Sequence, residues 1–277
     1  MSHVTASLRC NNRCVYCAQR GLDELAAPAV RPHEATVFAG GEPTLDPALP
    51  EQAAAARAVG DAPIVVQTNG RRLAYAQYTR QLLAAGVTHF DIALAGPTAA
   101  VHEYHTAAEG SYAQTVRGIQ TAVREGAIVA VTTVLTRSNF RHLPALAELC
   151  RTLGVGVWHL VAARGVGAAG AASQRVVPAL GMVGEFVADA TIRAERGGVR
   201  TVLTGVPLCV AGAAPSAQRR EDAAFGAACD GCVARDVCGG VHTEDLSAHD
   251  AALRPLRTRP VTAPLAPTWL GGTGWIG

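Results

Sequence analysis

The sequence predicts an α/β protein, namely an open, partial (β/α)6 barrel followed by a small cysteine-rich extension. Short apolar runs begin about every 30 residues, which is the spacing of successive strand–helix units. The runs are continuous rather than alternating, which indicates strands that are buried on both faces of a parallel sheet. Six such units are too few for a closed eight-stranded barrel, so we expect an open one.

The predicted strands and helices alternate along residues 1–200. The strands are expected at 3–8, 35–40, 63–68, 89–94, 128–136 and 155–162. The clearest helices are expected at 78–86, 111–126, 143–154 and 182–198. Ligands of parallel α/β folds bind at the carboxyl ends of the strands, so we expect functional residues in the loops that follow them.

The sequence divides into three parts, because the strand–helix pattern ends near residue 200. Residues 1–200 are expected to form the barrel, and residues 201–250 a cysteine-rich auxiliary region. Residues 251–277 are rich in Pro and Gly and are expected to form an extended tail. The sequence predicts no role for this tail.

The composition excludes several classes of function. All 24 basic residues are arginine, so no lysine is available for a pyridoxal Schiff base or a phosphate-binding P-loop. The net charge is +2 and basic runs are absent, which argues against a nucleic-acid partner. The sequence lacks a signal peptide and any apolar window long enough for a membrane span. We therefore expect a cytoplasmic protein with no membrane partner.

The expected cytoplasmic location bears on the role of the eight cysteines. A reducing compartment disfavours four disulfides, so metal or cluster binding is favoured for the eight cysteines. Cys10, Cys14 and Cys17 follow the first predicted strand. Three thiolates are one short of a structural zinc site, but they suit a [4Fe-4S] cluster with one iron left open. A zinc loop is the alternative that the spacing leaves open.

The N-terminal cysteine loop resembles the signature loop of radical S-adenosylmethionine (SAM) enzymes. The resemblance is based on the spacing C-x3-C-x2-C and on the aromatic Tyr16 directly before the third cysteine. The resemblance implies that Cys10, Cys14 and Cys17 hold a [4Fe-4S] cluster and that SAM binds its open iron. It also implies that Tyr16 packs near the adenine.

Two motifs at the next strand ends fit the same resemblance. The segment AGGEPTL contains the family's GGEP motif, which implies a site for the methionine amino group of SAM. The residues of this motif are Gly40, Gly41, Glu42 and Pro43. In the TNG segment that ends the third strand, Thr68 and Asn69 are expected either to contact SAM or to form a simple turn. Without the cysteine loop, GGEP would be interpreted as an ordinary strand–helix turn.

Four other residues have expected roles outside these motifs. The fourth strand carries Ala93 where many members of the family have a serine, so any polar contact of that serine must come from elsewhere. His159, in an apolar strand, is more often a hydrogen-bonded core residue than a ligand contact. Arg164, beyond the strand end, is expected to pair with a carboxylate. Cys150 lies within a predicted helix, and we expect it to be a small buried apolar residue.

A second cysteine group lies in the auxiliary region. Its members are Cys209, Cys229, Cys232 and Cys238. Four thiols suffice for zinc by count alone. The spacing C-x2-C-x5-C resembles the auxiliary-cluster region of SPASM and twitch extensions, which implies a second [4Fe-4S] cluster. His242 stands where SPASM proteins have a further cysteine, so it is a spectator, a supporting residue or a substitute ligand.

The resemblance implies a radical SAM enzyme, an oxidoreductase or maturase. It would cleave SAM reductively to a 5′-deoxyadenosyl radical, which takes hydrogen from a substrate, with the auxiliary cluster assisting oxidation. We expect maturation of a ribosomal peptide or another natural-product precursor, or else dehydrogenation of a small alcohol, sugar or nucleoside. An electron donor such as flavodoxin or ferredoxin is implied as partner. A non-catalytic zinc-binding module is the hypothesis of another class, and no side chain is assigned a catalytic role.

Overall fold

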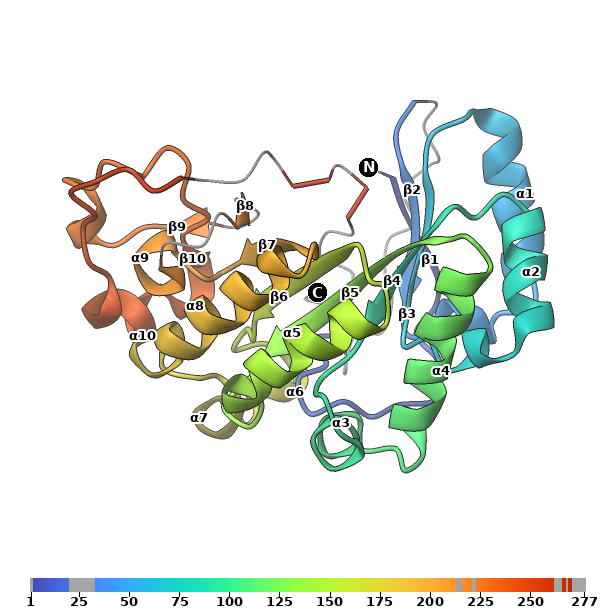
Figure 1. Ribbon diagram of the computed structural model, residues 1–277, viewed down its shortest axis with the longest axis horizontal. Helices are drawn as coiled ribbons and strands as arrows, with labels where there is room; N and C mark the ends of the chain where they lie inside the picture. The colour runs from blue at the N-terminus through green and yellow to red at the C-terminus, as the bar shows by residue number, and fades with distance from the viewer. Residues whose placement is uncertain are drawn as a thin grey trace.

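A computed structural model shows one sheet of eight parallel strands, arranged in the order in which they occur in the chain (Figure 1). The structure describes residues 2–19, 33–212, 216–220, 223–261, 266–267 and 269–270. The strands are β1 Ser2–Ser7, β2 Thr36–Gly40, β3 Ile64–Thr68, β4 His89–Ala93, β5 Ile128–Leu135, β6 Val157–Ala162, β7 Arg200–Thr204 and β8 Ala217–Arg219. Each pairs in parallel with the next, and the described strands show no pairing between β1 and β8. The sheet is therefore an open barrel, as predicted.

All six predicted strands are present, but the sheet has two more. β7 and β8 continue it past the expected boundary at residue 200. β8 is only three residues long and reads Ala-Gln-Arg, so it lacks the apolar run that identified the other strands. Its pairing with β7 depends on the tertiary fold rather than on local sequence.

Helices cover the outer face of the sheet (Figure 1). The longer ones are α1 Leu49–Val59, α2 Ala76–Ala84, α3 Ala99–Thr106, α4 Ser111–Arg124, α5 Leu143–Thr152 and α8 Leu180–Arg196. The short ones are α6 Gly167–Gly170, α7 Ser173–Val176, α9 Leu208–Ala211 and α10 Leu246–His249. The four predicted helices are α2, α4, α5 and α8, each beginning and ending within about two residues of its expected bounds.

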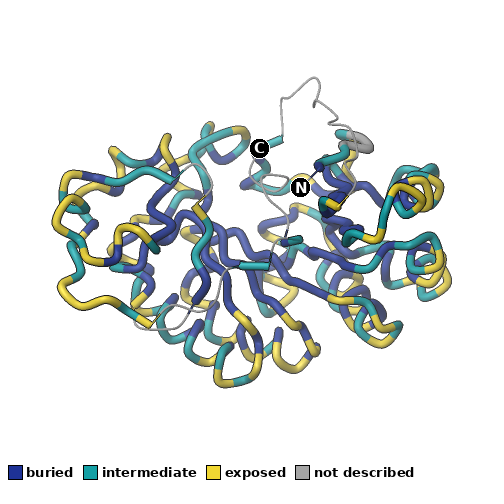
Figure 2. Tube along the Cα trace, turned by 90° about the horizontal axis from the view of Figure 1, so that it is seen from above, coloured by how far each residue is buried: buried dark blue, intermediate teal, exposed yellow. Residues whose placement is uncertain are grey.

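The main core lies between this helical layer and the sheet. Buried residues follow the strands and the facing sides of the helices (Figure 2). On β4, Phe90 and Ile92 point into this core together with Leu82 of α2 and Ile119 of α4. Because side chains alternate along a strand, His89, Asp91 and Ala93 face the inside of the barrel.

A row of buried polar side chains crosses the inner face on five consecutive strands. We call Gln67, Asp91, Thr132, His159 and Thr204 the polar belt. The Gln67 amide donates to Asp91 Oδ2 (3.2 Å), and the Thr132 hydroxyl donates to Asp91 Oδ1 (2.6 Å). His159 Nδ1 lies 3.4 Å from Thr132 Oγ1, and its Nε2 lies 2.8 Å from Thr204 Oγ1. His159 is therefore a hydrogen-bonded core residue, which is the first of the two roles expected for it.

The cysteine-rich region overlaps the end of the sheet, because Cys209 in α9 precedes β8. It contains a two-stranded antiparallel sheet of β9 Ala223–Ala224 and β10 Val241–His242. Arg164, at the end of β6, pairs with Glu244 just beyond β10 and so connects this region to the barrel. Of the predicted tail, residues 262–265, 268 and 271–277 lie outside the described residues. In the described part of the chain, no helix has both the length and the apolarity needed to cross a membrane.

The polar belt predicts how stability changes with pH. Burial, with a smaller contribution from Arg219, lowers the pKa of His159 from 6.5 to about 3. The folded state therefore keeps His159 neutral, while the unfolded state takes up a proton below pH 6.5. Stability from this residue is complete above that pH and is lost between 6.5 and about 3, reaching a loss of about 2 kcal/mol at pH 5.

Urea unfolding at pH 7 and pH 5 tests this expectation. His159→Gln should reduce the difference in unfolding free energy between the two pH values by about 2 kcal/mol. His142→Gln, at an exposed site, is the control and should leave that difference unchanged. An identical pH dependence in wild type and His159→Gln would contradict the assignment.

Candidate functional site

The three N-terminal cysteines line one cavity at the carboxyl ends of the strands. Cys10, Cys14 and Cys17 lie on the loop after β1, and the cavity has a volume of about 640 Å³. Several polar loop residues and strand ends share its lining; these are Asn12, Arg13, Gln19, Gly40, Gly41, Asn69, Ala93 and Thr106. The structure thus brings together the three thiols, Gly40 and Gly41 at the end of β2, and Asn69 after β3.

Backbone hydrogen bonds hold the cysteine loop against its neighbours. Arg13 N donates to Thr106 O (2.8 Å) and Val15 N to His105 O (2.9 Å), so the loop runs along the end of α3. Cys17 O accepts from Ala168 N (2.9 Å) at α6. The loop conformation is therefore determined by main-chain contacts on both sides, which leaves its cysteine side chains available for the cavity.

The electrostatics of the thiols fit a metal cluster. Burial, followed by the nearby thiols of Cys10 and Cys17, raises the pKa of Cys14 to about 12. Burial also raises the pKa of Cys10, and Glu42 and Cys17 add to that effect. A cationic metal would neutralise the charge of thiolates gathered at this position. Thiolates are the usual ligands of iron–sulfur clusters, so the donor set fits a [4Fe-4S] group.

Tyr16 closes one side of the cavity. Its side chain is buried, and its ring lies 6.1 Å from the ring of His105. Burial, together with the Cys14 thiol, raises the pKa of the Tyr16 phenol well above its ordinary value. The residue is therefore a neutral aromatic wall beside the three thiols.

The two glycines after β2 permit close contact with the cysteine loop. A Cβ atom at Gly41 would overlap the backbone of Leu8 and Arg9, where Glu42 N donates to Arg9 O (2.7 Å). Gly40 has φ 104°, a conformation that side chains with a Cβ rarely adopt. The GGEP segment is thus packed directly on the loop that carries the cysteines.

Glu42 connects the GGEP segment to the TNG segment through its buried side chain. Its carboxylate is 1% exposed and accepts from Thr44 N (3.1 Å), Thr44 Oγ1 (2.5 Å), Thr68 Oγ1 (2.6 Å) and Asn69 N (2.7 Å). Burial raises the pKa of this carboxyl, and the hydrogen bonds from Thr44 and Thr68 oppose that effect. The cavity lining includes Gly40, Gly41 and Asn69, whereas Glu42, Pro43 and Thr68 lie behind it.

The sequence analysis missed a second set of residues that position the site. Asn69 Nδ2 donates to Asn11 Oδ1 (2.7 Å), and Asn69 Oδ1 accepts from Arg71 N (3.0 Å). The Arg71 guanidinium donates to Asn11 O (2.7 Å) and to Asn12 Oδ1 (2.8 Å). The repeated asparagines directly after Cys10 were the available signal, because asparagine commonly bonds to loop backbone.

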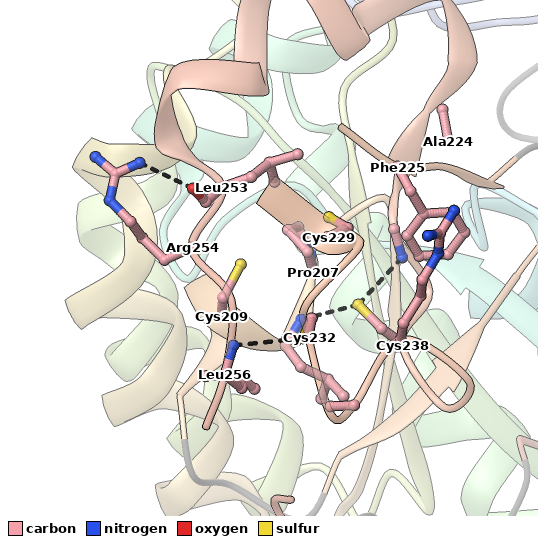
Figure 3. Close-up of a pocket in the computed structure, with 14 residues that line it drawn as sticks. Pro207, Cys209, Ala224, Phe225, Cys229, Cys232, Cys238, Leu253, Arg254 and Leu256 are labelled. Atoms are coloured by element: carbon pink, nitrogen blue, oxygen red, sulfur yellow. Dashed lines mark hydrogen bonds between the residues drawn. The ribbon is translucent and has the colours of Figure 1, made fainter. Parts of the chain in front are cut away.

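The second cysteine group gathers around another, much smaller cavity. Its volume is about 20 Å³, and it is lined by Cys209, Cys229, Cys232 and Cys238 (Figure 3). Cys238 Sγ accepts from Leu208 N and Gly240 N, both at 3.4 Å, and Cys232 Sγ accepts from Leu256 N (3.3 Å). Amide donors to sulfur tune iron–sulfur clusters, so the donor set fits such a group.

Two residues from the sequence analysis lie apart from both cavities. His242 is buried on β10, where its ring packs over Gly205, and it does not line the second cysteine cavity. Cys150 is fully buried in α5, as expected.

Within the described residues, no three or more His, Cys, Asp or Glu side chains are arranged to bind a single metal ion.

Sequence comparison identifies the class of protein. A family model described as "Radical SAM superfamily" matches residues 4–150. The match covers the cysteine loop, the GGEP and TNG segments, and more than half of the chain. The chain therefore belongs to the radical SAM superfamily.

Individual relatives within that superfamily differ in their named activities. The chain is 31% identical to an "AdoMet-dependent heme synthase" of Oleidesulfovibrio alaskensis, over 45% of this chain and 31% of that protein. It is 32% identical to a "Probable GTP 3',8-cyclase" of Methanopyrus kandleri, over 52% of this chain and 50% of that protein. The chain thus spans 31% and 50% of the length of these two curated relatives.

The fold is similar to that of a solved protein bound to a precursor peptide. The structure of Streptococcus suis SuiB bound to precursor peptide SuiA matches 72% of this chain and 48% of that one, with a TM-score of 0.56. The structure of SuiB bound to SAM matches 73% of this chain and 50% of that one, with a TM-score of 0.58. Sequence identities are 14% and 13%, so these similarities concern the fold alone.

Packing against the TNG segment yields one prediction. A Cβ atom at Gly118 in α4 would overlap the carbonyl oxygen of Gly70, directly after Asn69. Gly118→Ala should therefore lower the free energy of unfolding by about 1–3 kcal/mol and weaken SAM binding. Gly181→Ala in α8 is the matched control, because a Cβ there meets no atom within 4 Å. Equal stability of the two variants would contradict the predicted contact.

The cysteine assignments yield a second prediction. Cys14→Ala should reduce the iron content of anaerobically reconstituted protein from about eight to about four atoms per chain. Cys150→Ala removes a fully buried thiol from the core, away from the cavity, and should leave iron content unchanged. Iron and acid-labile sulfide analysis measures both variants, and full iron retention in Cys14→Ala would refute its role as a ligand.

Proposed function

We propose that this chain is a radical SAM enzyme whose Cys10, Cys14 and Cys17 hold a [4Fe-4S] cluster, with SAM bound at the open iron. The observation that carries the proposal is that these three thiols converge on one cavity of about 640 Å³ beside the GGEP and TNG segments. When bound, cluster and SAM together supply reductive cleavage of the sulfonium to methionine and a 5′-deoxyadenosyl radical that abstracts hydrogen.

The residues around the cavity have separate tasks in this proposal. Main-chain groups of Gly40 and Gly41 are exposed where the methionine end of SAM would lie, and the Asn69 side chain stands beside them. Tyr16 supplies an apolar surface for the adenine. Glu42 and Thr68 act indirectly, since their side chains bond to each other and hold the two loops at a constant distance. A fixed geometry is what controlled hydrogen abstraction requires of the protein.

We assign a second, auxiliary [4Fe-4S] cluster to the region 201–250. Support comes from the four thiols of Cys209, Cys229, Cys232 and Cys238 around one cavity, with amide donors to two of them. A cluster held by four cysteines has no open iron for substrate, so its task would be to take an electron from the substrate radical.

We propose a peptide precursor as the substrate, with a net oxidation or crosslink as the result. The SuiB–SuiA structure supports this choice, because its fold matches most of this chain and its partner is a precursor peptide. The curated relative named GTP 3',8-cyclase favours a second candidate, a nucleotide or other small hydroxylated molecule. A flavodoxin or ferredoxin would supply the electron in either case.

SAM cleavage tests the proposed function directly. Reduced, reconstituted protein should convert SAM to 5′-deoxyadenosine and methionine, and Cys14→Ala should lose at least about 100-fold of that activity, since the open-iron site is destroyed. Cys232→Ala should retain SAM cleavage within about tenfold while losing product formation on candidate peptides, measured by mass spectrometry. Protein that holds iron but forms no 5′-deoxyadenosine would contradict the proposal.

A further inference from the structure

Trp269 and Leu270 occupy the inside of the barrel, opposite to the cysteine cavity. Leu270 is fully buried in one cluster with residues from four strands. Those residues are Ala130 of β5, Val157 of β6, Val202 of β7 and Ala217 of β8. The Arg219 guanidinium on β8 donates to Leu270 O, so the segment is also held by its backbone.

Trp269, the residue before Leu270, covers the half of the sheet that begins at β2. Trp269 packs on Val37 and Ala39 of β2 and on Val65 of β3. Its ring lies 4.3 Å from the ring of His89 on β4, at an angle of 46°. Together, Trp269 and Leu270 thus pack against residues of the inner face whose clusters extend over the strands from β2 to β8.

This contact has a structural consequence because the barrel is open. In a closed barrel, hydrogen bonds around the ring set the curvature of the sheet. Here the described strands form a linear order from β1 to β8, so no such closure exists. Trp269 and Leu270 pack on the two halves of the sheet. They act as a wedge that keeps the two halves at a constant distance from each other.

The inner face of β4 shows how far this wedge lies from the reaction site. His89 contacts Trp269, Asp91 belongs to the polar belt, and Ala93 lines the cysteine cavity. Residues two apart on a strand are separated by roughly 7 Å, so the polar belt is one layer between the wedge and the cavity. The interior below the belt is therefore filled by the chain's own C-terminal segment.

We propose that Trp269 and Leu270 form a permanent floor of the barrel, which together with the polar belt above it confines the substrate to the mouth at the carboxyl ends of the strands. The proposal rests on the proposed function in taking the cysteine cavity as the reaction site. A floor at this depth favours a substrate that inserts a single group into the mouth, as an extended peptide inserts one side chain. It disfavours a molecule that must pass into the interior.

The test uses the full-length, reconstituted protein and three variants. Trp269→Ala should lower the melting temperature by roughly 4–10 °C and leave a space that binds added indole, which raises the melting temperature again. Trp269→Phe should fill most of that space and bind little indole. Val261→Ala, in the same segment but at a side chain that is 78% exposed, is the matched control and should behave as wild type.

SAM cleavage provides the second readout. It should stay within about twofold of wild type in Trp269→Ala, with or without indole, because the polar belt separates the floor from the cavity. If Trp269→Ala melts like Val261→Ala and binds no indole, the segment does not fill the barrel and the proposal is overturned. If indole binds and competes with SAM, the floor reaches the cofactor site, and the confinement to the mouth is wrong.

The outcomes separate this proposal from the proposed function. Wild-type protein that cleaves no SAM would end the proposed function, while the melting and indole measurements would still decide whether the floor exists. Hydrogen exchange of β7 and β8 adds an independent measure, since loss of the wedge in Leu270→Ala should accelerate exchange there at least about tenfold relative to Val261→Ala. Unchanged exchange would count against the wedge.

Discussion

The site depends on one constraint, the close approach of the backbone after β2 to the backbone after β1. Gly41 lies where any Cβ would overlap Leu8 and Arg9, and Glu42 N bonds to Arg9 O at 2.7 Å. This contact fixes the start of the cysteine loop relative to the sheet, and α3 and α6 fix the rest. Main-chain contacts thus set the positions of the three cysteines that line one cavity, while the side chain of Cys14 also packs against the buried cluster around Tyr16.

In the same region, the GGEP segment is connected to the TNG segment by the side chain of Glu42. The GGEP segment was expected to bind SAM with all four of its residues, yet only the glycines line the cavity. Glu42 turns away and accepts four hydrogen bonds from the segments that follow β2 and β3. A buried carboxylate with this many donors is a rigid connection, since loss of any donor leaves an uncompensated buried charge. We therefore interpret Glu42 as the residue that keeps the GGEP and TNG segments in a common geometry, and Asn69 as the one that extends that geometry to Asn11.

Much of this architecture could be predicted from sequence, because buried parallel strands have continuous apolar runs. β8 could not, since Ala217–Arg219 carries no apolar pattern and is defined only by its neighbour β7. α1 was also missed, because its run of alanines has no clear apolar period. The cysteine spacing identified both thiol groups, whereas the Asn69–Asn11 bond joins residues 58 apart and has no local signature. The role of Trp269 was equally hidden, because a Pro- and Gly-rich segment has no periodicity that indicates which surface it covers.

The account as a whole rests on an iron–sulfur cluster in the N-terminal loop with one iron open to SAM. Electron paramagnetic resonance of the reduced Cys229→Ala, Cys232→Ala double variant tests it most directly, because only the N-terminal group can then hold a cluster. The account predicts about four irons per chain and a resonance that changes when SAM is added. Zinc in place of iron, or a cluster signal that SAM leaves unchanged, would contradict it.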